Sequence, residues 1–499
     1  MARAGLIEAD VAVVGAGAAG LYAALTASRA GARVALVSAT ALARTASYWA
    51  QGGLAAALAV DDSPERHLED TLAAGRAAGR ESAARVLCED APARVRELAA
   101  LGVRFDADRF GRLALGLEGG HSVRRVVHAG GSATGRRITR QLSAAVVEDE
   151  RIVVLEARRA AALEVQDGRC TGLVCHDGSA VLARGVVLAS GGAAALWSRT
   201  TNPPGAFGSG VLLALEAGAP VADLELMQFH PTAVVDPRRT DTAGRRRRSV
   251  EGFLITEAIR GEGAILLDAA GERFVDELAP RDEVARAIRT RLLETAAPAV
   301  GLDMRMVDPR RFPNVVNALR DAGIEPTREL VPVAPAAHYL MGGVATDGEG
   351  RARLPGLYAV GECACTGLHG ANRLASNSLS ECFVFGRRAA LAALDEPPPS
   401  RVAAPGGGDA VETPATTLPT AETREAVWEL AGLERDREGL ERLRTHEHPL
   451  ARLVAASALA REESRGAHWR RDYPDRDPAL DQHHCVLAPG ANPAFERWT

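Results

Sequence analysis

An arginine and two histidines in separate parts of the chain could together bind a small dianion. Arg373 lies in the glycine-flanked segment GANRLASN, His230 in QFHPT and His338 in AAHYLMGG. Arginine presents a planar fork that binds a carboxylate through two hydrogen bonds. The two histidines, and Thr256 in LITEA, can donate to a second carboxylate. Either histidine taken alone is more often structural, so this prediction depends on their acting together.

A single carboxylate stands in a segment rich in cations. LEGGHSVRRVVHAGG places Glu118 among His121, Arg124, Arg125 and His128. A site for a simple dianion has no use for this carboxylate, because like charges repel. A dianion that also carries an ammonium group, in contrast, offers a cation that a carboxylate can bind and orient. Glu118 therefore either faces such a substrate or pairs with Arg124 or Arg125.

A second arginine, Arg281 in ELAPRDEV, could take part in proton transfer. A guanidinium is a poor base in water, and its simplest role is an ion pair with Asp276 or Glu277. In a dry, cationic cleft beside a bound dianion, the same group can relay a proton or stabilise charge. The residues alone leave both roles open.

The elements that must position these groups begin with a glycine turn, GAGAAG. It follows a predicted strand, DVAVV, and opens a predicted helix over residues 21–31, with another strand over 32–37. Gly15 permits the tight turn, Gly17 lets the backbone approach a pyrophosphate, and Gly20 lets helix and strand pack closely. Free N–H groups at the helix N-terminus favour the phosphates. The pattern predicts a dinucleotide site.

FAD is the dinucleotide that the rest of the chain favours. The acidic residue that usually ends the second strand is absent, since Ser38 and Ala39 stand there. Other segments must therefore share the binding. SYWAQGGLAAAL, residues 47–58, has a glycine pair that can bring backbone amides close to a flavin ring. GLYAVGECA, residues 356–364, is typical of a strand that ends beside the ribityl chain.

The order of these segments predicts an α/β fold with a split nucleotide domain. We expect a Rossmann-like FAD-binding domain of residues 1–225 and 335–395 and an inserted α+β capping domain of 226–334. Residues 396–419 are rich in Pro, Gly and Ala and indicate a linker. Residues 420–499 are expected to form a C-terminal helical domain and tail, because 423–444 and 450–465 show amphipathic helical patterns.

Composition excludes several classes of function. The chain has 499 residues and a net charge of -5, which gives no bulk attraction to nucleic acid or membrane. The Arg-rich loop at 238–248 is expected to be solvated. There is no lysine, so Schiff-base chemistry with pyridoxal phosphate is impossible. Seven scattered cysteines indicate neither a disulfide scaffold nor a metal site, although CAC at 363–365 could be read as one.

Localisation follows from what the sequence lacks. The opening residues carry Glu8 and Asp10 where a signal peptide needs an apolar core. No apolar run reaches the length of a membrane span. We therefore expect a cytoplasmic protein without membrane or nucleic-acid partners.

These segments resemble the fumarate reductase and succinate dehydrogenase flavoprotein superfamily. The match runs from about residue 8 to 395 and resumes at 461–474, and AQGGLAAAL, TTNPPGAFGSG, QFHPTAV, ITEAIRGEGA and GLHGANRLASNSL occur in the family's order. The resemblance is strongest to the members that oxidise L-aspartate on the quinolinate route to NAD. Ser209 departs from the family pattern, which usually has an aspartate at this position, and Ala39 stands where a lysine is frequent.

The resemblance implies a set of site residues. Those implied to contact FAD are Gly15, Ala16, Gly17, Ala18, Ala19, Gly20, Ser38, Ser47, Tyr48, Trp49, Ala50, Gln51, Gly52, Gly53, Ala161, Ser209, Glu362, Ser378 and Leu379. Those implied to bind a four-carbon dicarboxylate are Gln228, His230, Thr256, His338 and Arg373. Arg281 becomes the proton-transfer residue, and Glu118 the carboxylate that recognises the amine. No metal is expected.

The implied reaction is hydride transfer from Cα–H of L-aspartate to FAD, which yields iminoaspartate. Dioxygen or fumarate would reoxidise the flavin, giving hydrogen peroxide or succinate, and quinolinate synthase would receive the product. Membrane-bound relatives attach FAD through a histidine four residues before the Ala of AQGG. This chain has Ala46 there, so we expect non-covalent FAD.

Two alternatives remain. One is the flavoprotein subunit of a soluble fumarate reductase or succinate dehydrogenase, against which Glu118 and Ala46 argue. The other is a flavoprotein whose role is assembly with an iron–sulfur partner, without turnover of its own.

Overall fold

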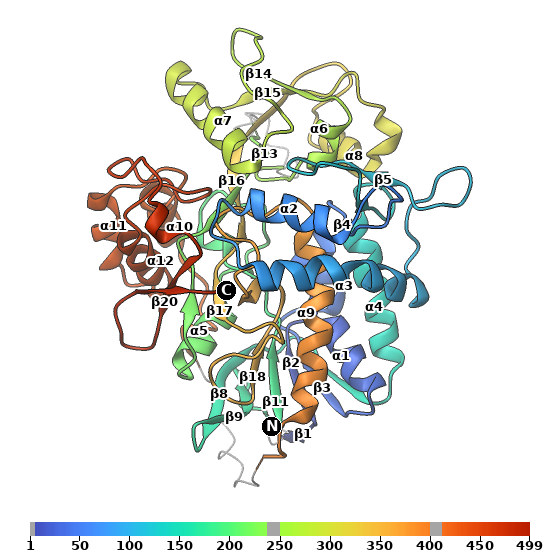
Figure 1. The fold of residues 1–499 in the computed structure, drawn as a ribbon, viewed down its shortest axis with the longest axis vertical. Coiled ribbons are helices and arrows are strands. Elements are labelled where there is room, and N and C mark those ends of the chain that lie inside the picture. Colours follow the sequence, from blue (N-terminus) through green and yellow to red (C-terminus); the bar gives the residue numbers. More distant parts are fainter. Residues whose placement is uncertain (1–4, 237–249, 400–411) are drawn as a thin grey trace, which may run out of the picture.

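A parallel β-sheet forms the centre of the protein. The computed structural model describes residues 5–236, 250–399 and 412–499, and Figure 1 shows their arrangement. In spatial order, the strands of this sheet are β18 (Leu357–Ala359), β11 (Gly185–Leu188), β2 (Val11–Val14), β3 (Val34–Val37) and β7 (Ile152–Leu155). All four pairings are parallel. The predicted strands at 10–14 and 32–37 are therefore both present in this sheet.

Both faces of the sheet are covered, so its strands are apolar at every position. Successive side chains of a strand point to opposite faces. Val11 and Val13 of β2 accordingly belong to one hydrophobic cluster, and Ala12 and Val14 belong to another. All four are buried. This is why DVAVV has no polar alternation, as expected for a strand inside a parallel sheet.

Helices cover one face. Residues of α1 (Ala18–Arg29), α3 (Glu81–Ala100), α4 (Thr134–Glu148) and α9 (Asn377–Ala392) share the cluster on this face, and α2 (Pro64–Ala74) packs on α3. Helices α1 and α9 lie side by side, although the whole middle of the chain separates them in sequence (Figure 1). Three short strands, β4 (Leu54–Ala55), β6 (Val126–Val127) and β5 (Leu115–Gly116), form a small sheet beside them.

A second, mostly antiparallel sheet and a helix lie on the other side. The strands are β1 (Leu6–Glu8), β10 (Ala180–Leu182), β9 (Arg169–Cys175) and β8 (Ala160–Gln166), and the helix is α5 (Ser209–Glu216). Strands β8 and β9 pair antiparallel as a hairpin. Its turn contains Asp167 and Gly168, both with positive φ.

The inserted segment forms a separate α+β unit. Its antiparallel sheet has the order β13 (Met227–Val234), β16 (Val331–Leu340), β15 (Val300–Asp303) and β14 (Ile265–Leu267). Three helices accompany it, α6 (Glu257–Gly261), α7 (Arg281–Thr295) and α8 (Pro313–Asp321). This unit has its own hydrophobic cluster and lies at the top of Figure 1.

The C-terminal segment is not purely helical. Helices α10 (Ala421–Leu430), α11 (Arg437–Arg444) and α12 (Pro449–Ala460) are followed by strands β20 (His483–Leu487) and β21 (Ala494–Arg497). The pattern over 423–444 is therefore two helices, and Asp436 caps the second by accepting from Gly439 N. The two strands extend a sheet whose other members are β19 (Ala364–Cys365), β17 (Gly343–Ala345) and β12 (Val221–Ala222).

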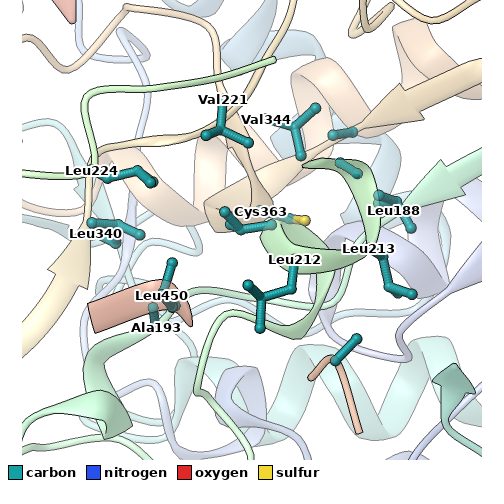
Figure 2. Packing of buried hydrophobic residues seen from close by; sticks show 14 of the residues in the cluster. Leu188, Ala193, Leu212, Leu213, Val221, Leu224, Leu340, Val344, Cys363 and Leu450 are labelled. Atoms are coloured by element: carbon teal, nitrogen blue, oxygen red, sulfur yellow. The ribbon is translucent and has the colours of Figure 1, made fainter. Parts of the chain in front are cut away.

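The C-terminal helices also share the main core. Leu450 of α12 lies near Ala193 and Leu212 in the cluster that contains Leu188 of the central sheet (Figure 2). The tail is thus built into the nucleotide domain by both a sheet and a core. No described helix has the length and apolar character that crossing a membrane requires.

The predicted fold class is confirmed, because a parallel α/β core carries an inserted α+β unit and C-terminal helices. We propose the boundaries given above as its domain division. The Arg-rich loop at 238–248 lies outside the described residues, as does 400–411 of the linker. At the end of the linker, Thr413 Oγ1 donates to Ala161 O at 2.8 Å.

Candidate active site

One large cavity opens where the central sheet, α1 and the capping unit meet. Its volume is about 440 Å³, which is within the range of small-molecule and cofactor sites. The glycine turn at Gly15 lies on its wall, as do His230 and Arg281 of the capping unit and Arg373 before α9. Segments from most of the chain's length therefore contribute to one site.

The glycine turn has the form that a dinucleotide needs. Gly15 has φ +110°, and a Cβ there would lie 2.2 Å from Ala189 O. A Cβ on Gly20 would lie 1.9 Å from Gly15 O, so only glycine lets the helix and the turn approach this closely. Gly17 is the N-cap of α1 and lines the cavity, so the helix N-terminus faces it, and Ala18 N donates to Ser47 Oγ at 3.0 Å. These features fit the pyrophosphate of FAD.

Most residues expected to contact FAD line the cavity. They are Gly15, Ala16, Gly17, Ala18, Ala19, Ser38, Ser47, Trp49, Ala50, Gln51, Gly52, Gly53, Ser209, Glu362, Ser378 and Leu379. Three do not reach its wall. Gly20 packs against Gly15, Tyr48 faces Arg140, and Ala161 lies behind its lining neighbour Ala160. The alternation of side chains along β8 explains the last case.

Glu362 is a buried carboxyl group on the same wall. It accepts from Leu340 N at 2.9 Å. Burial raises its pKa to about 7, against the opposing effects of that hydrogen bond and of Arg373. A carboxyl group that is partly protonated near neutral pH can donate as well as accept, which suits a contact with hydroxyl groups.

At the other end of the cavity, two histidines face each other. The rings of His230 and His338 are 5.1 Å apart. Burial, with the charge of Arg281, holds both pKa values well below the usual range, so both imidazoles are neutral. His230 Nδ1 accepts from Thr232 N at 3.2 Å. The proton of His230 is therefore on Nε2, from which it can be donated to a ligand.

Arg373 is a buried cation that no carboxylate neutralises within the described chain. Its Nη1 donates only to Leu374 O at 3.4 Å and Ser378 Oγ at 3.3 Å, and Nε has no partner. The guanidinium lies 4.6 Å from the centre of the Tyr339 ring. Burial and the charge of Arg281 lower its pKa to about 10. An unpaired buried cation is costly, and a bound dianion would remove that cost.

Arg281 is held by a partner that the sequence did not predict. Its Nε donates to Glu257 Oε2 at 2.7 Å and its Nη1 to Gln228 Oε1 at 3.2 Å. The alternative that Arg281 only pairs with Asp276 or Glu277 is not supported, since Arg281 bonds to Glu257 and Glu277 bonds to Arg273. Arg281 is the first residue of α7, so it can reach back over the turn before the helix.

Gln228 does not line the cavity but joins its two arginines. It accepts from Arg281, and its Nε2 donates to Arg373 O at 2.8 Å and to Asn372 Oδ1 at 2.9 Å. Behind Arg281, Glu257 also lies 3.4 Å from Arg260 Nη2. Arg260, Glu257 and Arg281 thus form a row of alternating charge that ends at the cavity.

Glu118 lies directly behind the cavity wall. Its carboxylate is 1% exposed and accepts from Ser376 Oγ at 2.6 Å and from His128 Nε2 at 3.3 Å. Burial alone raises its pKa, but these two hydrogen bonds and the charge of Arg281 lower it to about 2. Glu118 is therefore ionised next to a cationic cavity.

Neither arginine near Glu118 in sequence bonds to its carboxylate in the described structure. Arg125 is fully buried between Asp62 and Asp70, at 2.9 Å and 2.5 Å, and Arg124 is exposed. Glu118 is therefore not part of an ion pair with either arginine, which removes the simplest structural explanation of this carboxylate.

Sequence reasoning missed three residues at the site. Glu257 and Tyr339 immediately follow Thr256 and His338, so the quoted motifs contained a signal for both. Ser376 also lines the cavity. It stands in the quoted segment GANRLASN, three residues after Arg373, but its contact with Glu118 depends on how the chain enters α9.

One group of possible metal ligands occurs elsewhere in the described chain: Asp223, Cys365 and His484. None lines the cavity. Asp223 is already engaged by His484 Nδ1 at 2.5 Å and Cys485 N at 2.9 Å. Arg461, 3.6 Å away, supplies the neutralising charge.

A parallel sheet with a glycine turn, a cationic clamp and an inserted capping unit defines an FAD-dependent oxidoreductase. Comparison with known proteins agrees. A family model described as "FAD binding domain" matches residues 10–379, and one described as "Fumarate reductase flavoprotein C-term" matches 437–494. The structure of an Escherichia coli quinol fumarate reductase FrdA variant superposes with a TM-score of 0.84 at 29% identity, covering 98% of this chain and 96% of that one.

Curated relatives narrow the class. The chain is 43% identical to the L-aspartate oxidase of Streptomyces coelicolor, over 96% of this chain and 91% of that protein. It is 46% identical to the L-aspartate oxidase of Caulobacter vibrioides, over 93% and 94%. The chain belongs to the L-aspartate oxidase family.

Proposed function

We propose that this protein oxidises L-aspartate to iminoaspartate with FAD as the electron acceptor. The observation that carries the proposal is Glu118, an ionised carboxylate behind the wall of a cavity whose other charged groups suit a dianion. A dicarboxylate without an amine would gain nothing from that charge. The ammonium group of aspartate would be balanced by it.

Different side chains around the cavity would bind the two carboxylates of the substrate. Arg373 would hold one carboxylate through its fork, and neutral His230 and His338, with Thr256, would donate to the other. Gln228 fixes the position of Arg281 relative to Arg373, because it accepts from the Arg281 side chain and donates to the Arg373 backbone carbonyl. The capping unit supplies His230, Thr256 and Arg281 to the cavity wall, and it would exclude water once substrate and cofactor are bound.

When bound, FAD supplies the acceptor for two electrons and the hydrogen of Cα. Arg281 would hold or move a proton at its guanidinium, and Glu257, at 2.7 Å, is the group that can exchange it. Arg260, whose Nη2 lies 3.4 Å from Glu257 Oε1, extends this row of charges away from the cavity. Reoxidation by dioxygen would yield hydrogen peroxide, and reoxidation by fumarate would yield succinate.

The product of this reaction fits one biosynthetic route. The reaction would be the first step of the quinolinate route to NAD in the cytoplasm, with iminoaspartate passed to quinolinate synthase. The instability of an imine in water supports a prompt hand-off.

The decisive experiment mixes the oxidised, FAD-loaded protein anaerobically with L-aspartate or with succinate and follows flavin absorbance. We expect aspartate to bleach the flavin within seconds and succinate to leave it oxidised, because only aspartate has the ammonium that Glu118 balances. Bleaching by succinate alone would instead identify a fumarate reductase or succinate dehydrogenase flavoprotein.

FAD should be bound without a covalent bond. Ala46, the first residue of η2 (Ala46–Trp49), lines the cavity at the position where a linking histidine would stand, and its methyl group cannot form the link. Acid precipitation of the holoenzyme should leave yellow FAD in the supernatant. Colour that stays with the pellet would contradict this prediction.

A further inference from the structure

Ser376 connects the Glu118 carboxylate to the glycine loop of the cofactor site. Its hydroxyl donates to Glu118 Oε2 at 2.6 Å and accepts from Gly53 N at 3.0 Å. Ser376 and Gly53 line the cavity, whereas Glu118 lies behind its wall. The serine is therefore the polar group that stands between the carboxylate and the ligand space.

The direction of these hydrogen bonds is fixed by chemistry. A backbone N–H can only donate, so the Gly53 bond occupies a lone pair of the Ser376 oxygen. The hydroxyl proton is then free to point at Glu118, and a donated bond favours the ionised carboxylate. Two bonds in series through one hydroxyl also polarise each other.

The backbone at Ser376 is held in a conformation that serine rarely adopts. Its φ of +60° is left-handed, and it precedes α9 without capping that helix through its side chain. A strained residue persists where its surroundings require that geometry. Here the left-handed turn directs the hydroxyl away from the helix N-terminus and toward Glu118.

Resting on the proposed function, we infer that Ser376 is a positioning residue for amine recognition. It holds the Glu118 carboxylate toward the cavity and ties it to the loop that carries Gly52 and Gly53. Discrimination between aspartate and an amine-free dicarboxylate thus depends on a hydroxyl as well as on a carboxylate.

Other groups also face Glu118, and none can replace this contact. His128 bonds the other carboxylate oxygen at 3.3 Å. Arg281, His121 and Arg260 interact with it only through their charges. Ser376 is the hydroxyl that reaches Oε2.

The test compares three variants of the holoenzyme in anaerobic rapid mixing. For Ser376→Ala, we expect the half-saturating concentration of L-aspartate for flavin bleaching to rise about tenfold, because a hydrogen bond to a charged group is lost. The limiting rate should fall by no more than about threefold, because Arg281 and the clamp are intact. Succinate binding, measured as a shift of flavin absorbance, should change by no more than about twofold.

Two further variants separate the hydroxyl from the backbone. Ser376→Gly removes the hydroxyl and relieves the left-handed strain, so it should fold well and show the same aspartate defect. Ser380→Ala is the matched control, because Ser380 is a buried serine of α9, four residues on, whose hydroxyl donates to Ala55 O at 2.7 Å, away from Glu118. It should keep the ratio of aspartate to succinate affinity.

Coupling to Glu118 completes the test. Adding Ser376→Ala to Glu118→Gln should raise the half-saturating concentration of L-aspartate by no more than about a further twofold, because the two residues act as one unit. The inference would be overturned if Ser376→Ala weakened the binding of aspartate and of succinate equally, or if Ser376→Gly bound aspartate as well as the unmodified protein does. It would also be overturned if the two substitutions in the double variant lowered aspartate affinity independently. If aspartate failed to bleach even the unmodified protein, the proposed function would fail instead.

Discussion

Replacing Arg281 by leucine should abolish aspartate oxidation and fumarate reduction together. Arg281 is the only cavity cation bonded to a buried carboxylate in the described structure, and we assign to it proton movement in both directions. General acid–base groups contribute about 10²–10⁴-fold to rates, so kcat should fall by at least two orders of magnitude. Steady-state kinetics in both directions would measure the loss.

The control for this variant is Arg286→Leu. Arg286 is on the same helix, and its Nη1 donates to Gly466 O at 2.9 Å, outside the cavity. Both variants should keep their FAD, measured from the flavin absorbance of the purified protein. A substantial rate in either direction with FAD-loaded Arg281→Leu would move the proton-transfer role to another residue.

Glu118→Gln should affect the two directions differently. It keeps the size of the side chain but removes the charge that balances the substrate ammonium. A hydrogen bond to a charged group contributes about 1.5–3 kcal/mol, and stranding a buried charge costs about 2–5 kcal/mol. At about 1.4 kcal/mol per tenfold, kcat/KM for L-aspartate should fall by roughly one to three orders of magnitude.

Fumarate reduction should be kept or slightly improved in the same variant, because fumarate has no ammonium and its carboxylates lose a repulsive neighbour. Succinate should become a better competitor of aspartate. Glu283→Gln, a half-exposed carboxylate that pairs with Arg76, is the control and should change neither direction. Equal losses with aspartate and fumarate would mean that Glu118 only braces His128 and Ser376.

The sequence predicts the central sheet well because local rules and tertiary packing agree there. The apolar run at 11–14 needs burial on both faces, and Gly15 and Gly20 are sterically obligatory. The C-terminal strands were missed for the opposite reason. His483–Leu487 acquires its role from pairing with Val221–Ala222, a partner that no local pattern identifies.

At the site, too, the sequence predicts residues that local motifs mark and misses contacts that depend on tertiary packing. Arg373, His230 and His338 stand in distinctive segments, and all three meet at the cavity. Their partners are less accessible to sequence reasoning. Arg281 has carboxylates four and five residues before it, yet it bonds to Glu257, because the start of α7 points its side chain across the fold. Sequence distance is a poor guide to an ion pair at a helix terminus.

The strand order of the central sheet has a consequence for biosynthesis. Strand β11 pairs with β2 on one side and with β18 on the other, so only one strand separates Val11–Val14 from Leu357–Ala359 although they are far apart in sequence. Ribosomes extend chains by about 5–20 residues per second, and distant pairings slow folding. Helix α9 follows β18 in the chain and packs on α1, so the part of α1 that it covers stays exposed until residue 392 has emerged. We expect flavin loading to begin only after Glu362, Ser378 and Leu379 have emerged, and newly made protein to depend on chaperones during that interval.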